Sequence, residues 1–251
     1  MLTEIDYNKI EQEMRKEICQ QSDAWHNRIK TMLNNGESDE AIINSLMNDD
    51  DNSIKRLQSA ALNTLSSIHD VLISCANDKL TCRHILNKSV SRTGYQEKAQ
   101  FTMLSKNSLS CYNWIDLPSK PDDKYIPILN GKKLKSVDFI ASTTGASGRK
   151  YQVWVMAKYT SDEGGSQDNQ RNDLMSFADY ADTLNTSSNI IVVLLADGDY
   201  YKKKRRNFAK TGISGDFYHA MKSLHTSYGT RLIATTTGLF DTNMNALLQT
   251  M

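Results

Sequence analysis

The sequence predicts an α/β protein: a mixed sheet flanked by helices and preceded by an all-helical N-terminal region. Three patterns carry this prediction. Through about the first 85 residues, apolar side chains recur at intervals of three and four, which is the spacing of amphipathic helices. Beyond residue 89, short period-two runs alternate with helical patterns. After Asn189, residues 190–196 form a continuous apolar run rich in β-branched side chains, as expected of a central strand buried on both faces.

The N-terminal region divides into helices at recognisable start and stop signals. A first helix should end at Asn34-Asn35-Gly36, because glycine commonly terminates helices. A second helix, over 39–47, has Ser38 as its cap and acids in its first turn. A third is expected from about residue 53 to residue 75, since its apolar residues also fall at threes and fours. We assign residues 1–88 to this helical region and residues 89–251 to an α/β core.

The core region should alternate helices with strands, as layered α/β proteins do. Asn130-Gly131 predicts a hairpin turn after its first strand. The expected strands span residues 126–129, 135–142, 151–159, 189–196 and 232–235. The expected helices span residues 93–105, a segment after Gly164-Gly165, 215–227 and 243–251.

Composition places mild limits on the class of protein. Charged residues make up 24% and hydrophobic residues 39% of the chain, which is ordinary for a soluble globular protein. No apolar run approaches the roughly 20 residues of a membrane span, and the acidic N-terminus lacks the pattern of a secretory signal. The cysteines show no metal-type spacing, so reduced thiols and a cytoplasmic location are expected. They are Cys19, Cys75, Cys82 and Cys111.

Basic side chains gather in one short segment, although the net charge of the chain is only +1. Such a cluster suits phosphate contacts, whose attraction does not depend on base sequence and is sensitive to salt. A solvated loop or helix face is the alternative explanation. The segment contains no acid, and its cations are Lys202, Lys203, Lys204, Arg205, Arg206 and Lys210.

A second set of polar side chains follows Gly164-Gly165. Arginine can read guanine and amide side chains can read adenine in a DNA groove, whereas a solvated helix start would explain the same residues. The set consists of Gln167, Asn169, Gln170 and Arg171.

An acid and a lysine lie on two successive predicted strands. Asp138 lies on the first strand, and Lys158 ends the second. Carboxylates are ligands that Mg²⁺ prefers, and a bound divalent ion can generate hydroxide at neutral pH. A neighbouring lysine can orient the attacking water or offset negative charge in the transition state. The pair therefore suits phosphodiester hydrolysis, with a structural ion pair as the alternative.

Residues 89–240 resemble the PD-(D/E)XK nuclease superfamily, most of all the type II restriction endonucleases. In that family an acid on one core strand is followed by acid-x-lysine on the next strand and by a packing helix. Asp138 matches the first acid and Lys158 matches the lysine, while the segment 92–97 resembles the first helix, in which Glu97 would support the metal. The resemblance implies a restriction-endonuclease-like fold and a Mg²⁺-dependent, sequence-specific endonuclease that cuts double-stranded DNA as a homodimer.

The chain departs from the family at Met156, where a second acid is expected. A thioether cannot replace a carboxylate around Mg²⁺. Three explanations are open. The acid has moved to Asp173 or Asp168, with Glu97 a further candidate, or it has been lost by substitution. Alternatively, the chain is a naturally inactive nuclease fold that only binds DNA. Residues 1–88 would dimerise, bind DNA or regulate; a weaker alternative makes the chain a protein-interaction module built on them.

Overall fold

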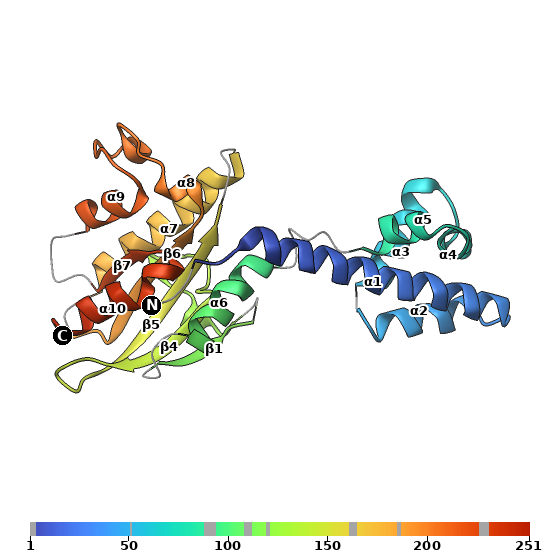
Figure 1. Ribbon diagram of the computed structural model, residues 1–251, viewed down its shortest axis with the longest axis horizontal. Helices are drawn as coiled ribbons and strands as arrows, with labels where there is room; N and C mark the ends of the chain where they lie inside the picture. Colours follow the sequence, from blue (N-terminus) through green and yellow to red (C-terminus); the bar gives the residue numbers. More distant parts are fainter. Residues whose placement is uncertain are drawn as a thin grey trace. The chain divides into compact units, whose positions relative to one another are not determined.

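The computed structural model describes residues 4–50, 52–87, 94–107, 112–118, 121–160, 165–184, 187–225 and 231–251. The chain forms two compact units (Figure 1). The helical unit comprises Tyr7–Tyr95, and the sheet unit combines the described residues before Tyr7 with Gln96–Met251. The predicted α/β class, with helices at the N-terminus and a mixed sheet, is confirmed.

The helical unit packs its helices around one apolar core. Trp25 and Ile29 of the first helix are buried against Leu46, Leu57 and Leu72 from later helices. Ser38 caps the second helix as predicted, because its side chain accepts a hydrogen bond from the backbone N–H of Ala41. The helices are α1 (Tyr7–Asn34), α2 (Asp39–Met47), α3 (Ser53–Thr64), α4 (Ile68–Asn77) and α5 (Lys79–Leu86).

The single helix predicted over 53–75 is wrong, because two helices occupy this stretch. Leu65 adopts a left-handed conformation with φ of 52° and ends α3. Ser67 and Asp70 then form a reciprocal capping box that starts α4. Leu65, which falls within the predicted apolar stripe, is 93% exposed. Local side-chain capping therefore overrides the apolar spacing at this point.

The five-stranded sheet of the described residues has the order β1-β4-β5-β6-β7. β4 pairs antiparallel with both β1 and β5, whereas β5, β6 and β7 run parallel. A separate two-stranded hairpin turns at Asn130-Gly131, as predicted, with positive φ at both residues. The strands of the sheet are β1 (Asn113–Asp116), β4 (Phe139–Thr144), β5 (Lys150–Tyr159), β6 (Ile190–Asp197) and β7 (Leu232–Thr235); those of the hairpin are β2 (Ile128–Leu129) and β3 (Lys132–Lys133).

Helices cover both faces of this sheet (Figure 1). Alternate residues of β5 enter two different cores, since Trp154 and Met156 pack on one face while Val155 and Ala157 pack on the other. The first face carries α7 (Gly165–Thr183), α8 (Asp199–Lys202) and α9 (Phe217–Leu224). The second carries α6 (Tyr95–Asn107) and α10 (Phe240–Leu248).

The strand predicted over 135–142 begins later, at Phe139. The residues before it pair elsewhere, because the N–H of Val137 donates to the carbonyl of Tyr125 at 3.2 Å. Asp138 consequently lies immediately before β4 rather than within it. No helix in the described ranges combines the length and apolar character needed to cross a membrane.

Asp23 ties α1 to α5, and we predict that this contact gives the helical unit a defined pH dependence. The carboxylate accepts two hydrogen bonds from Arg83, at 2.8 and 2.9 Å, and lies 2.8 Å from Lys79. The Arg83 hydrogen bonds, followed by the Lys79 hydrogen bond, lower the pKa of Asp23 to about 2. A carboxylate with a depressed folded-state pKa stabilises the fold above its ordinary pKa, and that contribution is lost as the pH falls through the depressed value.

Asp23→Asn should therefore lower the melting temperature at neutral pH, with a difference that shrinks as the pH approaches about 2. Circular-dichroism melts of the two proteins across this range measure the effect. Glu37→Gln, which neutralises an exposed carboxylate of the same unit, should leave the melting temperature unchanged. Identical melts of Asp23→Asn and the native chain at neutral pH would contradict the assignment.

Candidate active site and nucleic-acid interface

Three of the predicted site residues converge on one ammonium group near the end of β5. The Nζ of Lys158 lies 3.3 Å from Oδ2 of Asp138 and 4.0 Å from Oε1 of Glu97. It also donates a hydrogen bond to the carbonyl of Ala157 at 2.9 Å. The Lys158 side chain is only 12% exposed. Residues from α6, from the start of β4 and from β5 thus surround one cation with three oxygen atoms.

The position of Asp138 is fixed by the pairing of β4 with β5. Its backbone N–H donates to the carbonyl of Val155 at 2.9 Å. Its Oδ2 accepts a hydrogen bond from the backbone N–H of Ala157 at 2.7 Å. Because both main chain and side chain are held by the same strand, the carboxylate is pre-positioned beside Lys158.

Gln100, which the sequence analysis did not select, also holds the end of β5. It lies on α6 one turn after Glu97, is fully buried, and donates from Nε2 to the carbonyl of Lys158 and to Oδ2 of Asp197. Asp197 also accepts hydrogen bonds from the N–H and hydroxyl of Thr237, at 2.9 and 2.5 Å. The sequence contained only two signals for this network. Gln100 lies one helical turn after the candidate acid Glu97, and Asp197 ends a buried strand.

The surroundings of Glu97 raise the pKa of its carboxyl group above the ordinary value. Partial burial raises the pKa of Glu97, and the nearby charge of Asp138 raises it further, while the Lys158 ammonium acts in the opposite direction. Glu97 nevertheless remains accessible, since 43% of its side chain is exposed. A cation arriving from solvent can therefore reach this carboxyl group.

The oxygen atoms around Lys158 fit a magnesium ion that keeps several water ligands. Mg²⁺ typically takes one or two carboxylates together with waters and phosphate oxygens. Glu97 and Asp138 supply two carboxylates, and the Ala157 carbonyl lies beside the same ammonium. Over the described ranges, no group of three or more His, Cys, Asp or Glu side chains is arranged to hold an ion. The donor set suits a partly hydrated ion rather than one enclosed by protein ligands.

Met156 lies in the apolar core rather than among polar groups. It is 1% exposed and belongs to the apolar core beneath α7, together with Trp154 and Leu194. A carboxylate at this position would lie in an apolar environment, where a charge is costly.

The other acids considered as replacements form ion pairs away from Lys158. Asp173 pairs with Lys135 at 2.5 Å. Asp168 pairs with Arg171 at 3.0 Å and accepts a hydrogen bond from the Tyr200 hydroxyl at 2.8 Å. Of the candidate second acids, Glu97 is therefore the one that the fold brings to the lysine.

The segment Lys202–Lys210, called the basic loop, is anchored to the start of α7. Phe208 is buried in the core beneath α7, and its ring centroid lies 5.9 Å from the guanidinium of Arg171. Arg171 also donates to the hydroxyl of Tyr200, whose ring lies 5.0 Å from the guanidinium of Arg205. The loop is consequently held by packed aromatic rings. Lys202 pairs with Glu4 at 3.1 Å, and five cations of the loop are exposed. These are Lys202, Lys203, Lys204, Arg206 and Lys210.

The basic loop and the Lys158 cluster lie at the same edge of the sheet. Thr160, two residues after Lys158, donates its N–H to the carbonyl of Asp197 at 2.9 Å and accepts from the N–H of Tyr200 at 3.3 Å. Its hydroxyl donates to Gln170 of α7 at 2.7 Å. Because β5 and β6 are parallel, their carboxyl ends meet at this edge.

The polar residues at the start of α7 are engaged to different degrees. Gln170 and Arg171 make the intramolecular contacts described above, Asn169 is exposed, and the side chain of Gln167 lies outside the described part of the chain. The base-reading role predicted for this set stays a prediction.

No protein-family model matches the chain, and no match was found among curated proteins or among solved structures.

Proposed function

We propose that the chain is a Mg²⁺-dependent endonuclease that cuts double-stranded DNA at specific sequences and has a restriction-endonuclease-like fold. The observation that carries the proposal is the convergence of Glu97, Asp138 and Lys158 at the sheet edge that also bears the basic loop. The element order α6-β1-β4-β5-α7-β6 supports the proposed resemblance to PD-(D/E)XK nucleases. So does the change from antiparallel to parallel pairing at β5.

The residues of this cluster divide the work of phosphodiester hydrolysis. Glu97 and Asp138 would hold the Mg²⁺ ion, which supplies Lewis acidity and lowers the pKa of bound water. Lys158 orients the attacking water and offsets the negative charge that develops on the phosphate oxygens. A bond forms between the water oxygen and phosphorus as the bond to the leaving sugar oxygen breaks. Asp138 needs little reorganisation, because two backbone hydrogen bonds already fix it.

The basic loop would bind the DNA backbone next to this chemistry. Its cations attract phosphate without regard to base sequence, so binding should weaken steeply as salt rises. Two copies of the site are needed to cut both strands, which supports a homodimer as the active form. The helical unit would then dimerise, contact DNA or regulate.

Cleavage of mixed plasmid and phage DNA with Mg²⁺ or Mn²⁺ tests the proposal. Asp138→Ala and Lys158→Ala should each reduce cleavage by at least about 100-fold, while DNA binding at low salt is retained. Matched controls are Asp122→Ala and Lys133→Ala, which remove exposed surface charges of the same unit. Native-like cleavage by Asp138→Ala would remove this site assignment.

The raised pKa of Glu97 predicts how metal binding depends on pH. Only the deprotonated carboxylate binds Mg²⁺ or Mn²⁺, so metal binding should weaken as the pH falls through the raised pKa of Glu97. Glu97→Gln should weaken binding and remove this part of the pH dependence. Calorimetric titration with Mn²⁺ between about pH 5 and pH 8 measures both effects. A pH profile identical in the native chain and in Glu97→Gln would exclude Glu97 as a ligand.

A second candidate function is DNA binding without catalysis on a nuclease scaffold. The observation that favours it is the burial of Met156 in the apolar core, since the family's second acid is absent. Its signature is salt-sensitive DNA binding with no cleavage in either Mg²⁺ or Mn²⁺. Absence of any DNA affinity at low salt would instead favour the protein-interaction alternative.

The surroundings of Met156 predict that restoring an acid there destabilises the protein. Met156→Glu should cost on the order of 3 kcal/mol in unfolding free energy, because it buries a carboxylate without a partner. Met156→Leu should cost less than about 1.5 kcal/mol, since its volume is similar. Urea unfolding followed by circular dichroism compares the two. Native-like stability of Met156→Glu, together with new DNA cleavage, would place residue 156 in the active site instead.

A further inference from the structure

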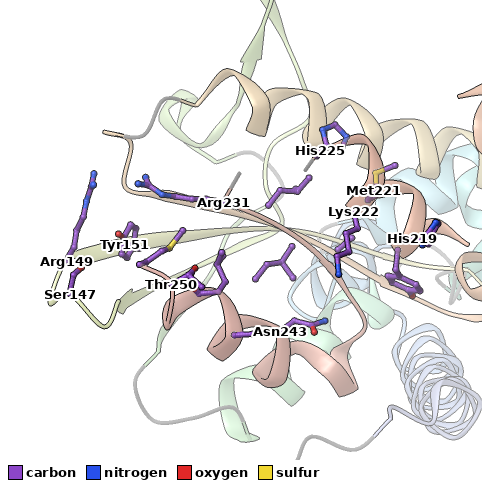
Figure 2. A pocket seen from close by; sticks show the side chains of 17 residues that line it. Ser147, Arg149, Tyr151, His219, Met221, Lys222, His225, Arg231, Asn243 and Thr250 are labelled. Carbon is purple, nitrogen blue, oxygen red and sulfur yellow. The ribbon is translucent and has the colours of Figure 1, made fainter. Parts of the chain in front are cut away.

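β7 is an edge strand of the described sheet, at the opposite end of the strand order from β1. A cleft of about 1090 Å³ runs along it (Figure 2). Leu232, Ile233 and Ala234 of β7 line it, with Lys222 of α9 and Asn243 of α10 among the residues on either side. The proposed nuclease chemistry uses none of these residues. The cleft is therefore a separate feature of the sheet unit.

β7 presents backbone groups to this cleft. Within the described part of the chain it pairs with β6 alone. The N–H of Val192 donates to the carbonyl of Arg231 at 2.7 Å, which fixes the alternation of the parallel ladder. Arg231 and Ile233 direct their backbone groups toward β6, so Leu232 and Ala234 direct theirs away from it, into the cleft. Such an edge is a template for another extended chain.

The side chains around this edge are positively charged. The guanidinium groups of Arg149 and Arg231 lie 5.5 and 5.2 Å from the ring centroid of Tyr151. Figure 2 shows these three residues at one end of the cleft, with Lys222 and His219 at the other. No Asp or Glu is found among the described residues that line it. Arg149 also donates from Nη2 to the carbonyl groups of Ser187 and Ser188. A guanidinium group favours a carboxylate, which it can bind through two parallel hydrogen bonds.

We propose that this cleft binds an extended acidic peptide segment of a partner protein, which adds to β7 as a further strand. The backbone of Leu232 and Ala234 would pair with the peptide main chain, and Arg149 and Arg231 would bind an acidic side chain. Added strands gain affinity from main-chain hydrogen bonds and specificity from alternate side chains. Nucleic acid fits less well, because a phosphodiester backbone offers acceptors but no donors for the strand's carbonyl groups.

Selection of random short peptides displayed on phage, with the full chain as bait, tests the charge requirement. Selected peptides should carry an excess of Asp and Glu and bind the native chain at least about 10-fold more tightly than the double variant Arg149→Glu/Arg231→Glu. The matched control is Lys132→Glu/Lys133→Glu, which makes the same charge change on the β2–β3 hairpin and should bind as the native chain does. Failure to enrich acidic peptides, or equal affinity for all three proteins, would overturn the proposal.

A second variant tests the strand pairing without changing charge. Ala234→Pro removes one outward N–H donor at an edge, where proline is tolerated, and should weaken binding of the selected acidic peptide. Hydrogen exchange should show that this peptide protects the amides of Leu232 and Ala234 in the native chain. If Ala234→Pro binds the selected peptide as tightly as the native chain does, the proposed strand addition is overturned. It is also overturned if duplex DNA, and not the peptide, protects the amides of Leu232 and Ala234.

Discussion

The pairing of β5 with its two neighbours is the constraint on which the candidate site depends. β5 runs antiparallel to β4 and parallel to β6. The antiparallel partner brings Asp138, at the start of β4, to Lys158, near the end of β5. The parallel partner ends at the same edge and continues into the basic loop. One buried strand thus determines that an acid, a lysine and the basic loop occur together.

Packed aromatic residues give the basic loop its support. Tyr200, Tyr201 and Phe208 are buried against the helices on the α7 face of the sheet. The T-shaped contact between Tyr201 and Phe217 has a centroid distance of 5.3 Å, within the range favoured by aromatic pairs. A loop held in this way would lose less conformational entropy on binding any partner than a disordered basic segment would.

Much of the fold could be predicted from local patterns, because strands and helices differ in their apolar period. The β-branched run 190–196 and the Asn130-Gly131 turn are examples whose signals are strong and local. The break between α3 and α4 was not predictable from apolar spacing, since a capping box decided it. The start of β4 also differs from the start of the predicted strand. Leu134 and Val137 form hydrogen bonds with the segment before the β2–β3 hairpin instead of with the sheet.

The proximity of Asp138 and Lys158 could be predicted from the strand pattern, whereas the environment of each side chain could not. Strand alternation places Met156 and Lys158 on the same face of β5, yet Met156 is enclosed in the apolar core, whereas the Lys158 ammonium meets Asp138 and Glu97. Which length of a strand is covered depends on helices distant in sequence, so alternation alone could not separate the two positions. The choice among Glu97, Asp168 and Asp173 depended in the same way on ion pairs between remote elements.

The oxygen-lined position of the Lys158 ammonium has a consequence for the charge balance of this cluster. Two neighbouring carboxylates repel each other, and the ammonium beside them serves as an internal counter-ion. If a divalent ion binds as proposed, it would exchange one cation for another rather than fill an open anionic trap. Such an exchange would weaken the net affinity for the ion. It would also free the lysine from its carboxylate contacts, so that its positive charge becomes available to a phosphate oxygen.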